Sequence, residues 1–246
     1  MITLTEITNK EKKHVFQNII SLGHCCAPAM QLEKFGYRKA SYPFDWLIIR
    51  DFRLVLELIR NGYSNTGFLE EEYFAQAKIK KNHYQNFKTK VRFLHDFDAY
   101  LPFKEQFPMF CQKYKRRMDR FQKDILQPTL FIRYIGDQEE LNFISENLME
   151  IESIIKEKCS DNEILFVCDE TLTPCIDIFI TKSDKGKINF NFIEDGKGLL
   201  DWLHMNYVSE LSFHPKKKSV IKNIKNKLES HFKKEYTHHI VYQDLD

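Results

Sequence analysis

Hydrophobic and polar positions follow one another along this chain in a pattern that predicts a strand and then a helix near its beginning. Residues 15–22 are mostly apolar and β-branched and are followed by Gly23, which is typical of a buried strand. The spacing of apolar residues becomes helical over residues 26–35. Pro28 suits only the first turn of a helix, where its missing N–H costs nothing. We therefore expect Cys26 at the beginning of a helix, directly after a strand.

The middle of the chain predicts two helices and a less regular segment. Apolar residues recur at helical spacing over residues 51–60, and a helix with many basic positions is predicted over residues 104–126. Residues 62–90 are irregular, aromatic and rich in Lys, and we interpret them as a possible insertion or lid. A short strand is expected at residues 91–94.

Later segments alternate between strands and helices. Residues 129–134, 164–168 and 188–193 have the composition of strands, and a long helix begins at Asp137. One face of that helix is apolar, with spacings of four, three and four residues. This alternation predicts an α/β fold, a single three-layer domain with a mainly parallel sheet flanked by helices.

The C-terminal part differs in charge from the rest. The segment from Pro215 to Glu235 carries eight Lys against two Glu, with an apolar stripe at helical spacing. We favour a helix that docks on the domain with a solvated Lys face over one that binds a membrane surface, RNA or an acidic partner. We accordingly expect a Cys-centred domain over residues 1–212 and a basic helix and tail over residues 213–246.

Composition excludes several classes of protein. A net charge of +2 argues against a specific nucleic-acid binder, and 43% hydrophobic residues argue against disorder. Apolar runs are too short for a transmembrane segment, and residues 1–13 have no signal-peptide core. We expect a cytoplasmic protein that acts on a small-molecule, peptide or glycan substrate. The composition does not indicate an oligomeric state.

One of the six cysteines stands apart because of its predicted place. No CxxC spacing occurs, and in a chain of this length free thiols are expected rather than disulfides. A thiol at a helix N-terminus faces unsatisfied N–H groups that stabilise a thiolate, so Cys26 is a candidate nucleophile. The same N–H groups could bind an oxyanion, with Gly23 allowing close approach. Alternatively, Cys25 and Cys26 simply fill a tight strand–helix corner.

A nucleophilic thiol needs a base and a group that orients the base. His95 follows a predicted strand and could protrude at the same sheet edge as Cys26, whereas His24 is too close in sequence and would only line the site. Asp45 is the candidate orienting acid. Asp96 is the alternative, although neighbouring residues on a strand face opposite ways.

Other residues are candidates for binding the substrate. Phe44 and Trp46 could hold a ligand and exclude water, and three arginines could bind an anionic group unless they form surface ion pairs. These arginines are Arg117, Arg120 and Arg133. We expect neither a metal nor a cofactor, because His24, Cys25 and Cys26 are contiguous and no Gly-rich phosphate-binding motif occurs.

Two motifs together resemble a known family. Ser21-Leu22-Gly23-x-x-Cys26 and Ser41-Tyr42-Pro43-Phe44-Asp45-Trp46 look like those of the papain-like cysteine peptidase family that is catalogued as a domain of unknown function. Phe93-x-His95-Asp96 and Leu130-Phe131-x-Arg133 are also similar, so the resemblance spans roughly residues 18–205. It implies Cys26 as nucleophile and a His as base, and a papain-like α+β fold as the alternative architecture.

This chain departs from the family pattern at one position. Cys25 stands where the family often carries Asn, which adds a second thiol, although the spacing from Gly23 favours Cys26. The arrangement is also similar to cysteine-dependent acetyltransferases of bacterial capsule synthesis.

Our leading hypothesis is therefore an enzyme that works through a thioester, either a hydrolase of the cysteine peptidase type or an acyltransferase. Cys26 would attack a carbonyl, His95 would accept the proton, and Asp45 would hold the imidazole. The alternatives are a non-catalytic module that binds a ligand or glycan, and a glycan-modifying transferase with an anionic donor.

Overall fold

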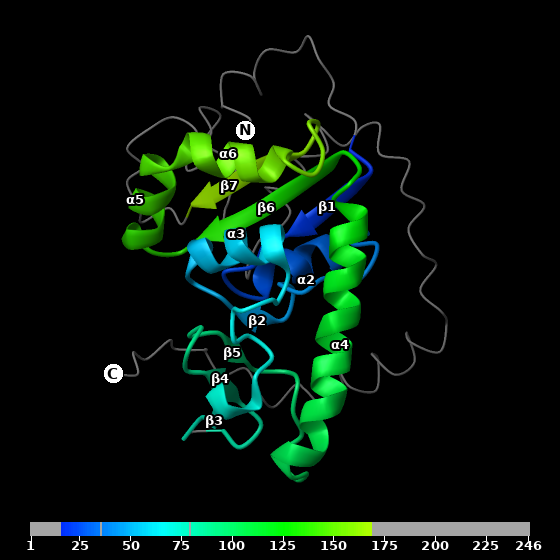
Figure 1. The fold of residues 1–246 in the computed structure, drawn as a ribbon, viewed down its shortest axis with the longest axis vertical. Helices are drawn as coiled ribbons and strands as arrows, with labels where there is room; N and C mark the ends of the chain where they lie inside the picture. Colours follow the sequence, from blue (N-terminus) through cyan, green and yellow to red (C-terminus); the bar gives the residue numbers. More distant parts are fainter. Residues whose placement is uncertain (1–15, 35, 79, 169–246) are drawn as a thin grey trace. The chain divides into compact units, whose positions relative to one another are not determined.

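The computed structural model describes residues 16–34, 36–78 and 80–168 (Figure 1). Within these ranges the chain has a mixed α/β architecture with two sheets, so the predicted fold class is confirmed. The predicted strand at residues 188–193 and the basic segment at residues 213–246 lie outside the described residues.

The first sheet is parallel and buried. Its three strands are β1 (Asn18–Ser21), β6 (Thr129–Ile135) and β7 (Glu163–Cys168), in the order β1-β6-β7. All four residues of β1 are buried, as expected for a strand covered on both faces. The parallel pairing predicted from the strand–helix alternation is thus present.

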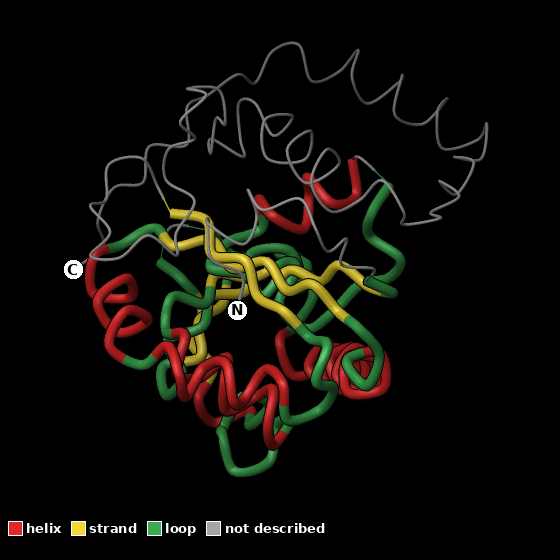
Figure 2. The backbone as a smooth tube through the Cα atoms, turned by 90° about the horizontal axis from the view of Figure 1, so that it is seen from above, coloured by secondary structure: helices red, strands yellow, loops and turns green. Residues whose placement is uncertain are grey.

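Helices lie on both sides of the strands when the molecule is seen from above (Figure 2). Helix α2 contacts β1 and β6, whereas α6 contacts β7 and α3. The helices are α2 (Ala27–Lys34), α3 (Phe52–Asn61), α4 (Phe103–Asp124), α5 (Gln138–Glu146) and α6 (Leu148–Lys156).

The long helix predicted from Asp137 is divided in two. Asn147 has φ −121° and ψ 23°, outside the helical region, and lies between α5 and α6. Its side-chain amide and its backbone N–H both donate to the carbonyl of Phe143. These bonds close the last turn of α5. The hydrogen bond from an Asn side chain to the nearby backbone competes with continuation of the helix. The apolar stripe continues across Asn147 and therefore does not reveal the break.

A second sheet is antiparallel and built from very short strands. Its order is β2-β5-β4-β3, and a single 3₁₀ turn, η1 (Glu71–Tyr73), leads into it. The strands are β2 (Leu47–Ile48), β3 (Phe74–Gln76), β4 (Tyr84–Asn86) and β5 (Arg92–Phe93). The irregular residues 62–90 therefore contribute two strands of this sheet, and a role as a lid remains a prediction.

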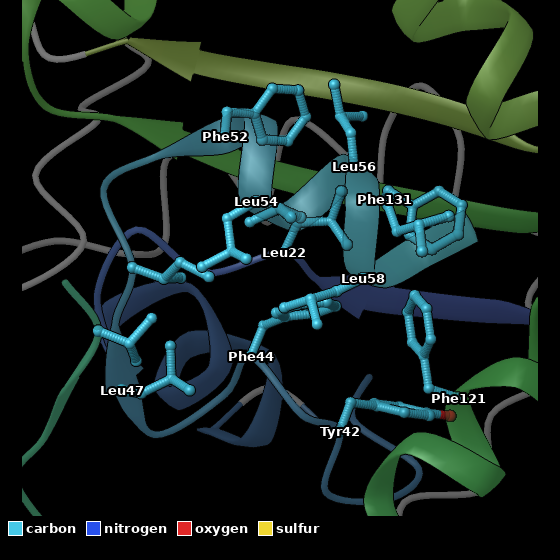
Figure 3. Packing of buried hydrophobic residues seen from close by; sticks show 14 of the residues in the cluster. Leu22, Tyr42, Phe44, Leu47, Phe52, Leu54, Leu56, Leu58, Phe121 and Phe131 are labelled. Carbon is cyan, nitrogen blue, oxygen red and sulfur yellow. The ribbon is translucent and has the colours of Figure 1, made fainter. Parts of the chain in front are cut away.

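Aromatic side chains join the two sheets to α4. Phe121 of α4 meets Phe44 edge-on at 5.4 Å between ring centroids and Tyr42 at 6.4 Å, and it also packs on Phe131 of β6 at 6.1 Å (Figure 3). The Tyr42 hydroxyl donates to Asp124 at 2.8 Å. These contacts anchor the segment before β2 against both α4 and the parallel sheet.

No helix within the described ranges is both long and apolar enough to cross a membrane.

Candidate active site

Cys26 lies at a sharp corner between β1 and α2. The backbone turns through Gly23 and His24, whose φ angles are +78° and +82°. A Cβ on Gly23 would come within 3.0 Å of the Phe44 carbonyl oxygen, so only glycine fits without strain. The Cys26 carbonyl accepts the Met30 N–H at 3.0 Å, the first hydrogen bond of the helix. The structure thus places the thiol beyond the carboxyl end of a parallel strand.

The Cys26 thiol is half-buried and neutral at physiological pH. Its pKa is raised to about 11, mainly by burial and to a smaller extent by Cys25, Asp96 and Asp45, whereas a backbone hydrogen bond opposes the shift. Within the described residues no hydrogen bond joins this sulfur to an imidazole. A reaction at Cys26 therefore needs a base that removes the proton as the sulfur attacks.

Asp45 closes the loop that carries the aromatic motif. Its Oδ2 accepts hydrogen bonds from Arg38 Nε at 2.9 Å and from the Tyr42 N–H at 2.8 Å. Burial raises the pKa of the Asp45 carboxyl, and the Arg38 guanidinium opposes this shift. Arg38 also donates to the Ser41 hydroxyl at 2.6 Å, so the loop is fixed at several points.

Trp46 connects this loop to His95. The Arg38 guanidinium lies 4.9 Å from the centroid of the Trp46 ring, and the exposed His95 meets the same ring edge-on at 6.5 Å. Among the described residues, Asp45 and His95 share neither a hydrogen bond nor an ion pair. In the described part of the chain, Arg38 and Trp46 thus link the predicted acid Asp45 to the predicted base His95.

Asp96, the alternative orienting acid, is held by α4. Lys113 Nζ lies 2.5 Å from its Oδ1, and the Tyr114 hydroxyl donates to its Oδ2 at 3.0 Å. The carboxylate is almost completely buried. Its charge also raises the pKa of the Cys26 thiol, by less than burial and Cys25 do.

His24 belongs to a buried network that the sequence did not indicate. Its Nδ1 lies 3.0 Å from Oε2 of Glu140, and Arg133 Nε donates to Oε1 of the same carboxylate at 2.6 Å. Arg133 is completely buried and also donates to the carbonyls of Leu22 at 2.8 Å and Ile49 at 2.9 Å. Arg133 therefore ties the ends of β1 and β2 to α5, and its predicted contact with a substrate remains a prediction.

The same corner contains a set of possible metal ligands. Ligand atoms of His24, Asp137 and Glu140 lie within 4.8 Å of one another. Asp137 caps α5 by accepting the Glu140 N–H at 2.8 Å, and Arg133 already balances the Glu140 charge. These hydrogen bonds and ion pairs are enough to explain why the three side chains lie together.

The sequence does not indicate a role for Glu140 in this network, for a clear reason. The Asp137-x-x-Glu140 spacing resembles a capping box and marks a helix N-terminus. Nothing in that spacing indicates that the Glu140 side chain turns toward His24, 116 residues away.

The remaining predicted binding residues lie on or against α4. Arg120 donates to the Ser41 carbonyl at 2.8 Å, and the Arg117 guanidinium lies 5.1 Å from the centroid of the Tyr114 ring. Phe44 is completely buried against Phe121 and forms part of the core. Arg120 and Phe44 therefore support the loop beside Cys26, whereas Arg117 forms no ion pair with another described residue and acts at longer range on Asp45.

Comparisons with known proteins agree with the family resemblance. The model of the family described as "Putative papain-like cysteine peptidase" matches residues 17–170, more than half of the chain. Uncharacterized protein R408 of Acanthamoeba polyphaga mimivirus is 27% identical over 161 residues, which cover 58% of this chain and 72% of that protein. No solved structure matches. Because the family match spans β1, the Cys26 corner, the aromatic loop and all the described strands of the parallel sheet, this chain belongs to the family described as "Putative papain-like cysteine peptidase".

Proposed function

We propose that the protein is a cysteine-dependent acyl-transfer enzyme, a peptidase-like hydrolase or an acyltransferase, with Cys26 as its nucleophile. The observation that supports this most directly is the position of the thiol. It is half-exposed between the carboxyl end of β1 and the N-terminus of α2, where unpaired helix amides can stabilise a developing oxyanion.

The proposed reaction has two steps. An imidazole takes the Cys26 proton while the sulfur attacks the substrate carbonyl, and the imidazolium then protonates the leaving group as the thioester forms. Water or an acceptor nucleophile next attacks the thioester and gives its proton to the same imidazole. The thiol is thereby restored, and the acyl group leaves as an acid or on the acceptor.

His95 is the proposed base, and Asp45 acts on it as a positioning residue. Asp45 holds Arg38, Arg38 stacks on Trp46, and the edge-on contact of Trp46 restricts the otherwise exposed imidazole. His24 is the competing base, because Glu140 already fixes one of its ring nitrogens. Separate His95→Ala and His24→Ala variants distinguish the two, since only loss of the base should abolish acylation of Cys26.

A second function is favoured by two observations. The Cys26 thiol has no hydrogen bond to an imidazole within the described residues, and its pKa is raised to about 11. A non-catalytic module that binds a ligand or glycan beside Trp46 would need no activated thiol.

The test is acylation by p-nitrophenyl acetate, followed by intact-protein and peptide mass spectrometry. We expect release of nitrophenolate and an acetyl group on Cys26, lost in Cys26→Ala and retained in Cys25→Ala, which is the matched control. Acetylation spread evenly over Cys25, Cys26 and Cys111 would contradict a specific nucleophile and would favour the binding module.

The fate of the acetyl group then separates the two enzyme classes. A hydrolase releases acetate into water at a rate that added alcohols and amines do not change. An acyltransferase keeps the thioester until an acceptor such as an amino sugar or a hydroxyl compound removes it.

A further inference from the structure

The antiparallel sheet ends in a strand that lies open on one side. In the order β2-β5-β4-β3, the outer strand β3 pairs with β4 alone among the described residues (Figure 1). Its sequence is Phe74-Ala75-Gln76, and the last two residues are exposed. Proteins commonly protect such an edge with a charged residue or a proline, because unpaired backbone groups are a template for another strand. Strand β3 contains neither, so its edge is available for pairing.

The backbone groups at this edge are directed away from β4. The Tyr73 carbonyl and the Ala77 N–H each form a hydrogen bond of 2.8 Å to the chain on the β4 side. Because alternate residues of an antiparallel strand face opposite neighbours, the backbone groups of Phe74 and Gln76 are directed to the free edge. The Phe74 N–H donates to the Glu71 carbonyl. The groups that a further strand would meet are therefore the Phe74 carbonyl and both backbone groups of Gln76.

Opposite charges flank the two ends of β3. Three acidic residues precede the strand and three basic residues follow it, and within the described part of the chain none of the six forms an ion pair. These exposed residues are Glu70, Glu71, Glu72, Lys78, Lys80 and Lys81. An antiparallel copy of the same edge would bring each acidic end against a basic end. The edge is therefore complementary in charge to itself.

A groove at the acidic end has room for a side chain. Its volume is about 660 Å³, and it is lined by Glu70, Glu71, Glu72, Phe74, Phe103 and Lys104. The rings of Phe74 and Phe103, with centroids 5.8 Å apart, supply its apolar surface. A lysine side chain suits such a groove, because its methylene stem can lie on apolar surface while its ammonium group stays among carboxylates.

We propose that two copies of the chain associate through β3, paired antiparallel about a twofold axis at Ala75. Phe74 then faces Gln76 of the second copy, and Glu72 faces Lys78 of the second copy, because these residues lie equally far from Ala75 on opposite sides. The Gln76 N–H of each copy donates to the Phe74 carbonyl of the other. The lysine enters the groove, and the two four-stranded sheets become one continuous sheet.

The proposed interface is separate from the candidate active site. Strands β3 and β2 are the two opposite edges of the sheet, and Trp46 directly precedes β2. The inference goes beyond the proposed function and does not depend on a reaction at Cys26. Measurements of assembly and of acetylation therefore test the two proposals separately.

Reversal of single charges provides the first test, with sedimentation equilibrium of the full chain as the measurement. Glu72→Lys and Lys78→Glu each place like charges opposite one another at two points of the dimer. We expect the dissociation constant of the dimer to rise about tenfold or more in each variant. An equimolar mixture of the two variants restores both pairs of opposite charges and should dimerise as the wild-type chain does.

The matched control is Glu139→Lys, which makes the same charge change at an exposed position of α5. Its dissociation constant should stay within about twofold of the wild-type value. A wild-type chain that remains monomeric up to its solubility limit would overturn the proposal. An equal weakening in Glu139→Lys, or a mixture of the two variants that does not dimerise, would overturn it as well.

A cysteine on the proposed axis tests the register and is independent of the charge variants. Ala75→Cys places two thiols at a non-hydrogen-bonded pair, where the Cα atoms are about 4.5 Å apart and a disulfide can form. Glutathione disulfide supplies the oxidant: the two thiols are oxidised to one disulfide, and two molecules of glutathione are released. We expect most chains to appear as a linked dimer on a non-reducing gel.

Ala77→Cys is the control for the register, because its two thiols would lie about 13 Å apart along the paired strands. It should give no more linked dimer than the wild-type chain, which shows the background from the native cysteines. Equal yields of linked dimer in Ala75→Cys and Ala77→Cys, or a yield in Ala75→Cys no higher than in the wild-type chain, would contradict the proposed pairing.

Discussion

His24 and Glu140 lie 116 residues apart in the chain, and their side chains meet at 3.0 Å between Nδ1 and Oε2. Arg133 binds the other oxygen of the same carboxylate. All three side chains are buried, so the corner before Cys26 is held by a charged network and not by apolar packing alone. The first two predictions test this network.

Loss of the Glu140 carboxylate should destabilise the fold strongly. Glu140→Ala leaves the Arg133 guanidinium buried without its counter-ion, and breaking such a pair costs about 3–5 kcal/mol. Glu140→Gln keeps the shape and part of the hydrogen bonding and should cost less. Urea unfolding measures both, with the exposed neighbour Glu139→Ala as control. Equal costs for Glu139→Ala and Glu140→Ala would contradict the network.

Gly136→Ala should displace the His24 imidazole. A Cβ at this position would lie 2.6 Å from His24 Nε2, and the ring cannot move freely because Glu140 and Tyr134 hold it. We expect a loss of about 1–3 kcal/mol in the free energy of unfolding. In a His24→Ala background the same change should cost at least about 0.5 kcal/mol less, which a double-mutant cycle measures. Additive effects would mean that the two residues do not meet.

Alkylation of Cys26 should depend steeply on pH. Its pKa is raised from the ordinary 9.0 to about 11 by burial, so the thiolate is the minor form throughout the neutral range. The rate with iodoacetamide should rise about tenfold per pH unit between about pH 7 and 10, without a plateau. Residue-resolved labelling in Cys25→Ala measures it. A plateau near pH 7 would instead indicate a thiolate that an imidazolium already stabilises.

Arg38→Lys should lower the rate of Cys26 acylation more than it lowers stability. Lysine cannot bind Asp45, Glu33 and Ser41 together or stack on Trp46, so Trp46 and His95 lose their fixed positions. We expect a loss of about tenfold or more in the rate with p-nitrophenyl acetate.

The matched control for this prediction is Arg53→Lys. Arg53 also stacks on an aromatic ring, that of Phe143, but it is exposed and lies on α3. The rate at which Cys26 is acylated in Arg53→Lys should stay within about twofold of the wild-type rate. A similar loss in both variants would mean that Arg38 acts only through general stability.

The local parts of the fold could be predicted from the sequence. The apolar run of β1, the Gly23 turn and Pro28 in the first turn of α2 together indicated where Cys26 lies, because each signal acts within a few residues. Strands β6 and β7 were also visible, since a parallel sheet buried on both faces needs continuous apolar runs.

Features that depend on distant partners could not be predicted. Strands β3 and β4 have three residues each, too few to show a periodicity. Their place in the sheet depends on β5 and on contacts with aromatic side chains of α4 such as Phe110. The role of Arg133 depends on Glu140, which joins it only after α5 folds back over the end of β6. Asp45 was expected to contact His95, but Arg38, seven residues before it, occupies the carboxylate.

The pairing of β1 also affects when the site can exist. Within the described residues β1 pairs only with β6, and Asn18 and Thr129, which are in register, are 111 residues apart. During synthesis on the ribosome, the strand that leads to Cys26 therefore waits for β6, whose paired residues are made 111 residues later. We expect nascent chains that stop before β6 to carry an unassembled Cys26 corner, so that any reactivity of this thiol would arise only late in translation.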